Sequence, residues 1–213
     1  MKDSLILFGG TFNPLHNGHM AIAIKLHEVF NHCITFLPTG IPPYKTAPLT
    51  TAKERLEMLQ NVIDGDDRFS IDTCEIHKNE FCYTYKTLKE IRNKVGNTVP
   101  IFFIIGSDSL VTLDTWDNWT TLFDLTNFII IKRPNYNDNS MNSDLLIEYR
   151  KRLNSNLDTF KTSGNGQFYI VDLEPINISS TQIRNNIKHN QSIRELVPAK
   201  INEYILTHNL YAQ

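Results

Sequence analysis

Hydrophobic residues along the chain gather into short continuous runs, and longer stretches of mixed polarity separate these runs. Apolar runs of about four to eight residues are typical of strands that are buried on both faces of a sheet. We expect such strands at Leu5–Phe8, Cys33–Leu37, Ile101–Ile105, Phe128–Ile131 and Phe168–Leu173, with a weaker one at Phe69–Asp72.

In the stretches between these runs, apolar side chains recur every three or four residues, which is the spacing of one helix face. The sets that we expect to face the core are Ile22, Leu26, Val29 and Phe30; Leu56, Leu59 and Ile63; Leu88, Ile91 and Val95; Leu146, Tyr149 and Leu153. Thr51 and Glu54 have the spacing of a capping box, which predicts a helix start directly after Thr51. Strands that alternate with helices in this way predict right-handed βαβ units and a mostly parallel sheet.

The C-terminal part, about residues 178–213, has a helical pattern. Ser180 or Thr181 is the expected cap of one helix, and Ala199–Thr207 is expected to form another. The chain has 213 residues, with no internal repeat and no linker-like change in composition. We therefore expect a single α/β domain over residues 1–213 that ends in a helical tail.

Composition and charge narrow the class of protein. The formal net charge is −2, which argues against a polybasic surface for nucleic acid or membrane. The apolar runs fall short of the roughly 18 residues that span a bilayer, and Leu5–Phe8 is too short for a signal-peptide core. The three cysteines include no CxxC pair, so we expect reduced thiols. The expected setting is the cytoplasm, without nucleic-acid or membrane partners.

The strongest chemical signal follows the first expected strand. The segment from Gly9 to His19 reads GGTFNPLHNGH and leads directly into a helix. Its glycines let backbone amides approach a ligand, and the helix start adds further amides and a positive dipole end, which together suit phosphate. His16 and His19 stand three residues apart at the helix entry, where both can point toward the same anion.

Single features of this segment have other interpretations. A Gly-Gly pair after a strand is also common in tight turns, and HxxH spacing also occurs in metal pairs. However, no third ligand stands at a recognisable spacing, and the glycines match neither the dinucleotide fingerprint nor a Walker loop. Taken whole, the segment resembles the signature of the nucleotidyltransferase superfamily that carries an HxGH motif. This resemblance implies a Rossmann-like, three-layer fold that binds ATP or CTP and transfers its nucleotidyl group with release of pyrophosphate.

A second motif supports this resemblance. The segment Asn177–Arg184 reads NISSTQIR and resembles the ISSTxxR element of the same superfamily, although a Ser/Thr helix start alone is most often only a cap. The resemblance implies that the amides of this helix start and Arg184 meet the β- and γ-phosphates.

Motifs in the middle of the chain resemble one branch, the bacterial nicotinate mononucleotide adenylyltransferases. They are the proline-rich Leu37–Lys45, the Tyr-Thr pair in Cys82–Thr84, the IIGSDSL of Ile104–Leu110, and Trp116. The branch implies that nicotinate mononucleotide attacks the α-phosphorus of ATP through its phosphate, giving nicotinate adenine dinucleotide and pyrophosphate. The sequence departs from the common family pattern at Thr39, Tyr44 and Cys82, which bears on the substrate contacts of the proline-rich loop.

The resemblance also implies roles for particular residues. His16 and His19 would hold the triphosphate and stabilise the transition state, Arg184 would bind the outgoing pyrophosphate, and Lys45 would bind the substrate or the triphosphate. The further ATP-binding residues would be Gly9, Gly10, Thr11, Phe12, Gly18, Gly106, Asp108, Ile178, Ser179, Ser180 and Thr181. Mg²⁺ would arrive with ATP and be held by phosphate oxygens and water, without a dedicated protein cage.

The nicotinate half of the site would lie near Tyr83, Thr84 and Trp116. Backbone amides near the first two would bind the carboxylate, and the pyridine ring would stack on Trp116. Residue type alone leaves alternatives: Trp116 as a core aromatic, Asp108 as a favourable charge at a helix N-terminus, and Lys45 as a solvated side chain.

Other functions stay open from the sequence. They are an adenylyltransferase for nicotinamide mononucleotide or pantetheine phosphate, a cytidylyltransferase, a tRNA-ligase fragment and a non-catalytic nucleotide sensor. The length and the middle motifs count against pantetheine phosphate as the acceptor and against cytidylyl transfer, whereas the choice between nicotinate and nicotinamide mononucleotide stays open. The charge of −2 counts against the tRNA-ligase fragment, and both histidines with Arg184 count against the sensor.

Overall fold

The computed structural model describes residues 4–43, 48–132, 137–173 and 177–212. The chain divides into two compact units, each built from two segments that are distant in the sequence. Unit 1 comprises Met1–Gly9 and Tyr83–Pro175, and unit 2 comprises Gly10–Cys82 and Ile176–Gln213. The expectation of a single domain over residues 1–213 stays a prediction.

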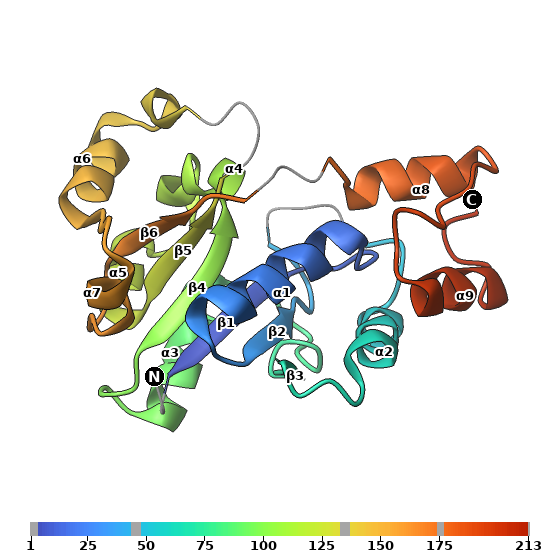
Figure 1. The fold of residues 1–213 in the computed structure, drawn as a ribbon, viewed down its shortest axis with the longest axis horizontal. Coiled ribbons are helices and arrows are strands. Elements are labelled where there is room, and N and C mark those ends of the chain that lie inside the picture. The colour runs from blue at the N-terminus through green and yellow to red at the C-terminus, as the bar shows by residue number, and fades with distance from the viewer. Residues whose placement is uncertain (1–3, 44–47, 133–136, 174–176, 213) are drawn as a thin grey trace. The chain divides into compact units, whose positions relative to one another are not determined.

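Unit 1 is organised around parallel strands (Figure 1). These are β1 (Leu5–Gly10), β4 (Ile101–Gly106), β5 (Asn127–Ile131) and β6 (Phe168–Val171), each hydrogen-bonded to the next. Residues of β4 and β5 are almost entirely buried, as their continuous apolar runs predict.

The helices of unit 1 connect these strands. They are α3 (Thr84–Val95), α4 (Ser107–Leu110), α5 (Leu122–Leu125), α6 (Ser143–Arg152) and α7 (Leu157–Lys161), with 3₁₀ turns at Leu113–Thr115, Trp119–Thr121 and Asp138–Ser140. Asn142 and Asn156 cap α6 and α7, because each side-chain oxygen accepts a backbone N–H three residues further on, at 2.8 and 3.0 Å.

Unit 2 holds two parallel strands, β2 (Ile34–Pro38) and β3 (Phe69–Ile71), and the remaining helices. The helices are α1 (Asn17–Phe30), α2 (Ala52–Ile63), α8 (Ser180–Lys188) and α9 (Ala199–Thr207), with α2 packed against α9. The capping box is confirmed: Thr51 accepts the Glu54 amide at 3.2 Å, and the Glu54 carboxylate accepts the Thr51 amide at 2.7 Å.

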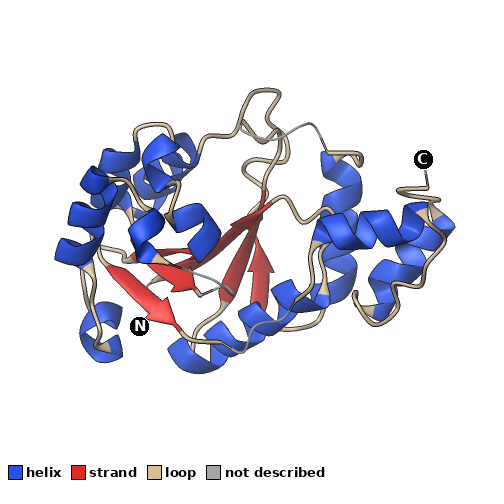
Figure 2. Cartoon of the chain, turned by 90° about the horizontal axis from the view of Figure 1, so that it is seen from above, coloured by secondary structure: helices blue, strands red, loops and turns tan. Residues whose placement is uncertain are grey.

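The strand order is β3-β2-β1-β4-β5-β6, and helices flank the strands (Figure 2). This is the order of a Rossmann-type sheet, so the predicted fold class is confirmed, as is the helical C-terminal part. In such sheets, ligands bind beyond the carboxyl ends of the strands where the order reverses, which here are β1 and β4.

Several details of the core differ from the sequence prediction. Four residues that were expected to face the core are only half-buried, namely Ile22, Val29, Leu56 and Val95. β6 is an outer strand, and its neighbouring residues Tyr169 and Ile170 are only half-buried, so each of its faces is only partly covered. On α6 the buried face consists of Leu145 and Tyr149, whereas Leu153 lies just past the helix end and is 42% exposed. The helical period therefore predicts the buried position of Tyr149 correctly, but not those of Leu146 and Leu153.

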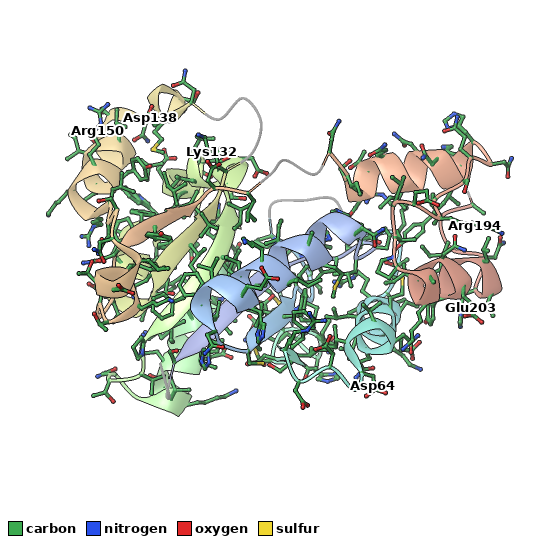
Figure 3. All side chains as sticks on the ribbon, in the orientation of Figure 1. Asp64, Lys132, Asp138, Arg150, Arg194 and Glu203 are labelled. Atoms are coloured by element: carbon green, nitrogen blue, oxygen red, sulfur yellow. The ribbon has the colours of Figure 1, made fainter. Side chains whose placement is uncertain are left out.

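Many charged side chains lie at the surface of each unit. Figure 3 labels examples on or next to their elements, including Asp64 after α2, Arg150 on α6 and Glu203 on α9, all of which are exposed. Within the described ranges, no helix has both the length and the apolar character needed to cross a membrane.

Candidate active site

The loop between β1 and α1 has a strained backbone at Phe12. Its φ of 48° lies in the left-handed region, which costs a non-glycine residue about 1–2 kcal/mol. The buried Phe12 ring meets the His19 ring edge-on, with 5.1 Å between centroids. A Cβ at Gly10 would lie 2.9 Å from the Phe12 ring, so glycine is needed there. The strain therefore sets an aromatic ring against one of the two motif histidines.

The two motif histidines cap α1 reciprocally. The His19 amide donates to Nδ1 of His16, and the His16 amide donates to Nδ1 of His19, both at 3.3 Å. Their rings are stacked, with 3.6 Å between centroids and 24° between planes. His16 is the N-cap residue and is only 5% exposed. The HxGH spacing thus forms a capping box in which imidazoles replace the usual hydroxyl and carboxylate.

This arrangement fixes the tautomer of each ring. A nitrogen that accepts an amide hydrogen carries no proton, so each neutral imidazole carries its proton on Nε2. The pair therefore presents two Nε2–H donors from one helix start, whose dipole also favours an anion. These are the properties that a site for a triphosphate requires.

The start of α8 contacts the same loop. Ser179 is the N-cap, because its Oγ accepts a backbone N–H at 3.1 Å, so the prediction of Ser180 or Thr181 as the cap is wrong. Ser180 Oγ donates instead to the carbonyl of Pro14 at 2.9 Å, which ties the helix to the loop. The sequence could not distinguish neighbouring hydroxyls, since all three residues are good caps.

Arg184, one turn further along α8, is half-buried and oriented by two acceptors. Its Nη1 donates to the carbonyl of Asn13 at 2.7 Å, and its Nη2 donates to Thr181 Oγ1 at 3.2 Å. Because Asn13 precedes His16 by three residues, the structure attaches the predicted pyrophosphate-binding arginine to the loop that carries the histidine pair.

Arg55 on α2 is a structural centre of this loop that sequence reasoning missed. The side chain is 1% exposed, and its guanidinium donates to the carbonyls of Thr11 (2.8 Å), Thr39 (2.6 Å) and Gly40 (2.8 Å). Burial lowers the pKa of the Arg55 guanidinium, and its Nε has no hydrogen-bond partner among the described residues. An arginine in an amphipathic helix is typical of a solvated face, so only its position in the helical period could have indicated burial.

Asn13 is the second such centre. Its side chain is buried, and Oδ1 accepts hydrogen bonds from Thr50 Oγ1 and from the hydroxyl of Tyr211, both at 2.7 Å. Burial raises the pKa of Tyr211 to about 12. The phenol is therefore protonated at neutral pH and available as the donor that a carboxamide oxygen requires.

The raised pKa of Tyr211 predicts a loss of stability at high pH. Above pH 10 the unfolded chain releases this proton while the folded chain keeps it, so the free energy of unfolding falls as pH rises from about 10 to 12. The contribution is fully present below pH 10 and is on the order of 2 kcal/mol. Urea unfolding across this range measures it: Tyr211→Phe should show a shallower fall than the wild type, and equal slopes would contradict the assignment.

In unit 1, the residues expected to contact ATP stand at the carboxyl end of β4. Gly106 is the last residue of that strand and the N-cap of α4, and exposed Asp108 lies in the first turn of this helix. A Cβ at Gly9, near the end of β1, would lie 2.6 Å from the ring of Phe103 on β4, so strand packing explains this glycine. A ligand-binding role for these residues stays a prediction.

The expected nicotinate-binding residues also lie in unit 1. Tyr83 is the N-cap of α3, and Thr84 is its first residue, so backbone amides of a helix start are present there. Trp116 is half-buried at the end of a 3₁₀ turn, with its amide donating to the Leu113 carbonyl at 3.0 Å. The ring is therefore neither a fully buried core aromatic nor a fully exposed one.

The other residues that the sequence singled out have simple positions. Gly18 is buried in the first turn of α1, and neighbouring Asn17 donates to the Glu195 carbonyl at 3.0 Å. Thr11 and Ile178 are half-buried. Lys45 and Tyr44 lie outside the described residues.

Cys33, Cys74 and Cys82 are all free thiols; burial raises the pKa of Cys74 to about 12 and also raises that of Cys82. Over residues 4–43, 48–132, 137–173 and 177–212, no group of three or more His, Cys, Asp or Glu side chains is arranged to hold a metal ion.

Comparison with known proteins identifies the family. The chain matches the cytidylyltransferase-like family over residues 7–186. It is 38% identical to a probable nicotinate-nucleotide adenylyltransferase of Clostridium acetobutylicum, over 99% of this chain and 100% of the relative. It is 34% identical to the protein of the same name from Saccharophagus degradans, over 97% and 95%. The chain therefore belongs to the cytidylyltransferase-like nucleotidyltransferases, among the nicotinate-nucleotide adenylyltransferases.

A solved structure supports the fold. Nicotinic acid mononucleotide adenylyltransferase of Plasmodium falciparum, solved in complex with NaAD, superimposes with a TM-score of 0.75. The superposition covers 98% of this chain and 97% of the Plasmodium falciparum chain, at 21% sequence identity. The similarity in fold thus extends over nearly the whole chain.

Proposed function

We propose that this protein transfers the adenylyl group of ATP to the phosphate of nicotinate mononucleotide, giving nicotinate adenine dinucleotide and pyrophosphate in NAD biosynthesis. The observation that carries the proposal is the stacked pair His16 and His19, whose reciprocal caps through Nδ1 put the proton of each neutral ring on Nε2 at the start of α1. The near-full-length similarity to nicotinate-nucleotide adenylyltransferases supports the same reaction.

The chemistry asks the protein for alignment and charge neutralisation. An oxygen of the mononucleotide phosphate forms a bond to the α-phosphorus of ATP, and the bond from that phosphorus to the oxygen that bridges to the β-phosphate breaks. The attacking oxygen is already anionic near neutral pH, so no general base is needed. Donors aimed at the phosphates stabilise the charge that develops in the transition state.

The donors in unit 2 suit this task. His16 and His19 would donate to the triphosphate, Arg184 would bind the β- and γ-phosphates that leave as pyrophosphate, and Lys45 would add a further positive charge. The backbone amides of the β1–α1 loop and of the α8 start, with Gly10 to Phe12, Gly18 and Ile178 to Thr181, would complete the phosphate site. In unit 1, Gly9, Gly106 and Asp108 would contact the rest of ATP.

The nicotinate group would be bound by residues of unit 1. Amides at the α3 start, at Tyr83 and Thr84, would bind the carboxylate, and Trp116 would stack on the pyridine ring. A divalent ion, which we propose to be Mg²⁺, would shield the phosphate charge; phosphate oxygens and water supply most ligands to such an ion. We place the enzyme in the cytoplasm, a reducing compartment that suits its free thiols.

Pyrophosphate release tests the acceptor directly. ATP and Mg²⁺ would be incubated with the protein and, in parallel, with nicotinate mononucleotide, nicotinamide mononucleotide or pantetheine phosphate. We expect rapid release with nicotinate mononucleotide and much slower release with the others, because a carboxylate leaves no group unpaired against the expected amides. Equal rates with the acid and the amide would remove the specificity proposed for Tyr83 and Thr84. No release with any acceptor would contradict the proposed function.

A further inference from the structure

We propose that Tyr211, near the C-terminus, is a positioning residue for Arg184 and acts through the buried side chain of Asn13. The inference rests on the proposed function, in which Arg184 binds the β- and γ-phosphates. It adds a component that neither motif contains, since Tyr211 is separated from Asn13 by 198 residues in the sequence.

The contacts form one continuous chain within unit 2. The Tyr211 hydroxyl donates to Asn13 Oδ1 at 2.7 Å, and the backbone carbonyl of Asn13 accepts Arg184 Nη1 at 2.7 Å. Thr50 Oγ1 donates to the same Oδ1 at 2.7 Å. The side chain of Asn13 is therefore held by two hydroxyls, while its carbonyl holds the arginine.

Burial makes these contacts consequential. Asn13 is 8% exposed and Tyr211 is 7% exposed, so water cannot readily replace a lost donor. A carboxamide oxygen has two lone-pair directions, and the two hydroxyls use both. Thr50 and Tyr211 thus both hold the orientation of the Asn13 side chain.

The backbone of Tyr211 supports a specific role for its contact. Its φ of 65° lies in the left-handed region, which costs about 1–2 kcal/mol in a non-glycine residue. Such a conformation persists only where surrounding contacts determine it. Here the strained backbone turns the phenol inward to Asn13, at the end of the chain beyond α9.

Loss of the Tyr211 hydroxyl should therefore loosen the peptide that orients Arg184. In Tyr211→Phe we expect the affinity for inorganic pyrophosphate, measured by calorimetry on the full chain, to fall about fivefold, which corresponds to one buried hydrogen bond. The KM for ATP should rise by a similar factor. The KM for nicotinate mononucleotide should stay unchanged, because no contact in this chain of residues leads to that substrate.

Tyr204→Phe is the matched control. Tyr204 is also buried near the end of the chain, and its hydroxyl donates to a carboxylate oxygen of Glu57 at 2.5 Å rather than to Asn13. It should lose stability but keep the wild-type affinity for pyrophosphate. Thr50→Val removes the second donor to Asn13 and should weaken pyrophosphate binding like Tyr211→Phe, whereas Thr50→Ser should restore it.

The outcomes separate this inference from the proposed function. Wild-type pyrophosphate affinity in Tyr211→Phe, or an equal loss in Tyr204→Phe, would overturn the positioning role while leaving adenylyl transfer intact. Absence of dinucleotide synthesis by the wild type would contradict the proposed function, yet the pyrophosphate measurement would still test the role of Tyr211. If Tyr211→Phe fails to fold, Thr50→Val decides, and unchanged binding in that variant would overturn the inference.

Discussion

Replacement of His19 by alanine is expected to lower kcat at least about a hundredfold, the scale for losing one preorganised donor to a transition state. The reason lies in the reciprocal caps: with Nδ1 of His19 accepting the His16 amide, the neutral ring presents Nε2–H as its donor. Alanine removes that donor and also the ring stacked 3.6 Å from His16. Steady-state rates of pyrophosphate release with saturating ATP and nicotinate mononucleotide measure the effect.

Two further variants at this position separate catalysis from helix capping. In His19→Asn the carboxamide ends near the place of Nδ1, so it can keep the cap but cannot replace Nε2. In His19→Gln the carboxamide reaches the place of Nε2 and gives up the cap. We expect the His19→Asn variant to be as inactive as His19→Ala, and the His19→Gln variant to retain more activity. His77→Ala, at an exposed histidine of unit 2, should behave like the wild type. Wild-type turnover in His19→Asn would contradict the role of Nε2.

Arg55→Met is expected to destabilise the fold by about 3 kcal/mol. The substitution leaves the carbonyls of Thr11, Thr39 and Gly40 without their donor in a buried place, at about 1–3 kcal/mol for each group. The substitution also removes a buried charge whose Nε has no hydrogen-bond partner among the described residues, and this offsets part of that cost. The expected net loss therefore stays below the upper limit of the summed costs for the three carbonyls. The midpoint of urea unfolding should fall, with an unchanged slope if the unfolded state is the same.

Arg68→Met is the control for this prediction. Arg68 is exposed and pairs with Asp66 at 2.7 Å on the surface, where an ion pair contributes little. The urea midpoint of Arg68→Met should stay close to that of the wild type. Equal midpoints in Arg55→Met and the wild type would show that the hydrogen bonds of Arg55 to the carbonyls of Thr11, Thr39 and Gly40 do not stabilise the fold.

The sequence predicts the strands well because each is a continuous apolar run. The buried β4 and β5 carry their full signal in five or six neighbouring residues. The half-buried Tyr169 and Ile170 of β6 were not predicted, because strand order decides which strand lies outermost and hydrophobic periodicity does not report it. The cap of α2 was predicted, since both of its partners lie within four residues.

In the candidate site, too, the sequence predicts features formed by neighbouring residues and misses those formed by residues that are distant along the chain. The motif placed His16 and His19 three residues apart, and the structure adds that their rings stack and cap each other. The contacts of Arg55 and Tyr211 join segments that are distant in the sequence, so no local pattern could have indicated them. A buried arginine and a tyrosine near the chain end look like solvated or packing residues until their partners are known.

Transfer of label from ATP tests the central claim most directly. Two reactions with nicotinate mononucleotide would use ATP labelled at the α-phosphate or at the γ-phosphate, and the products would be separated. The account predicts that the α-label appears in nicotinate adenine dinucleotide and the γ-label in pyrophosphate, with both transfers reduced together in His19→Ala. Retention of the α-label in ATP, or its appearance in AMP or ADP instead of the dinucleotide, would contradict adenylyl transfer by this protein.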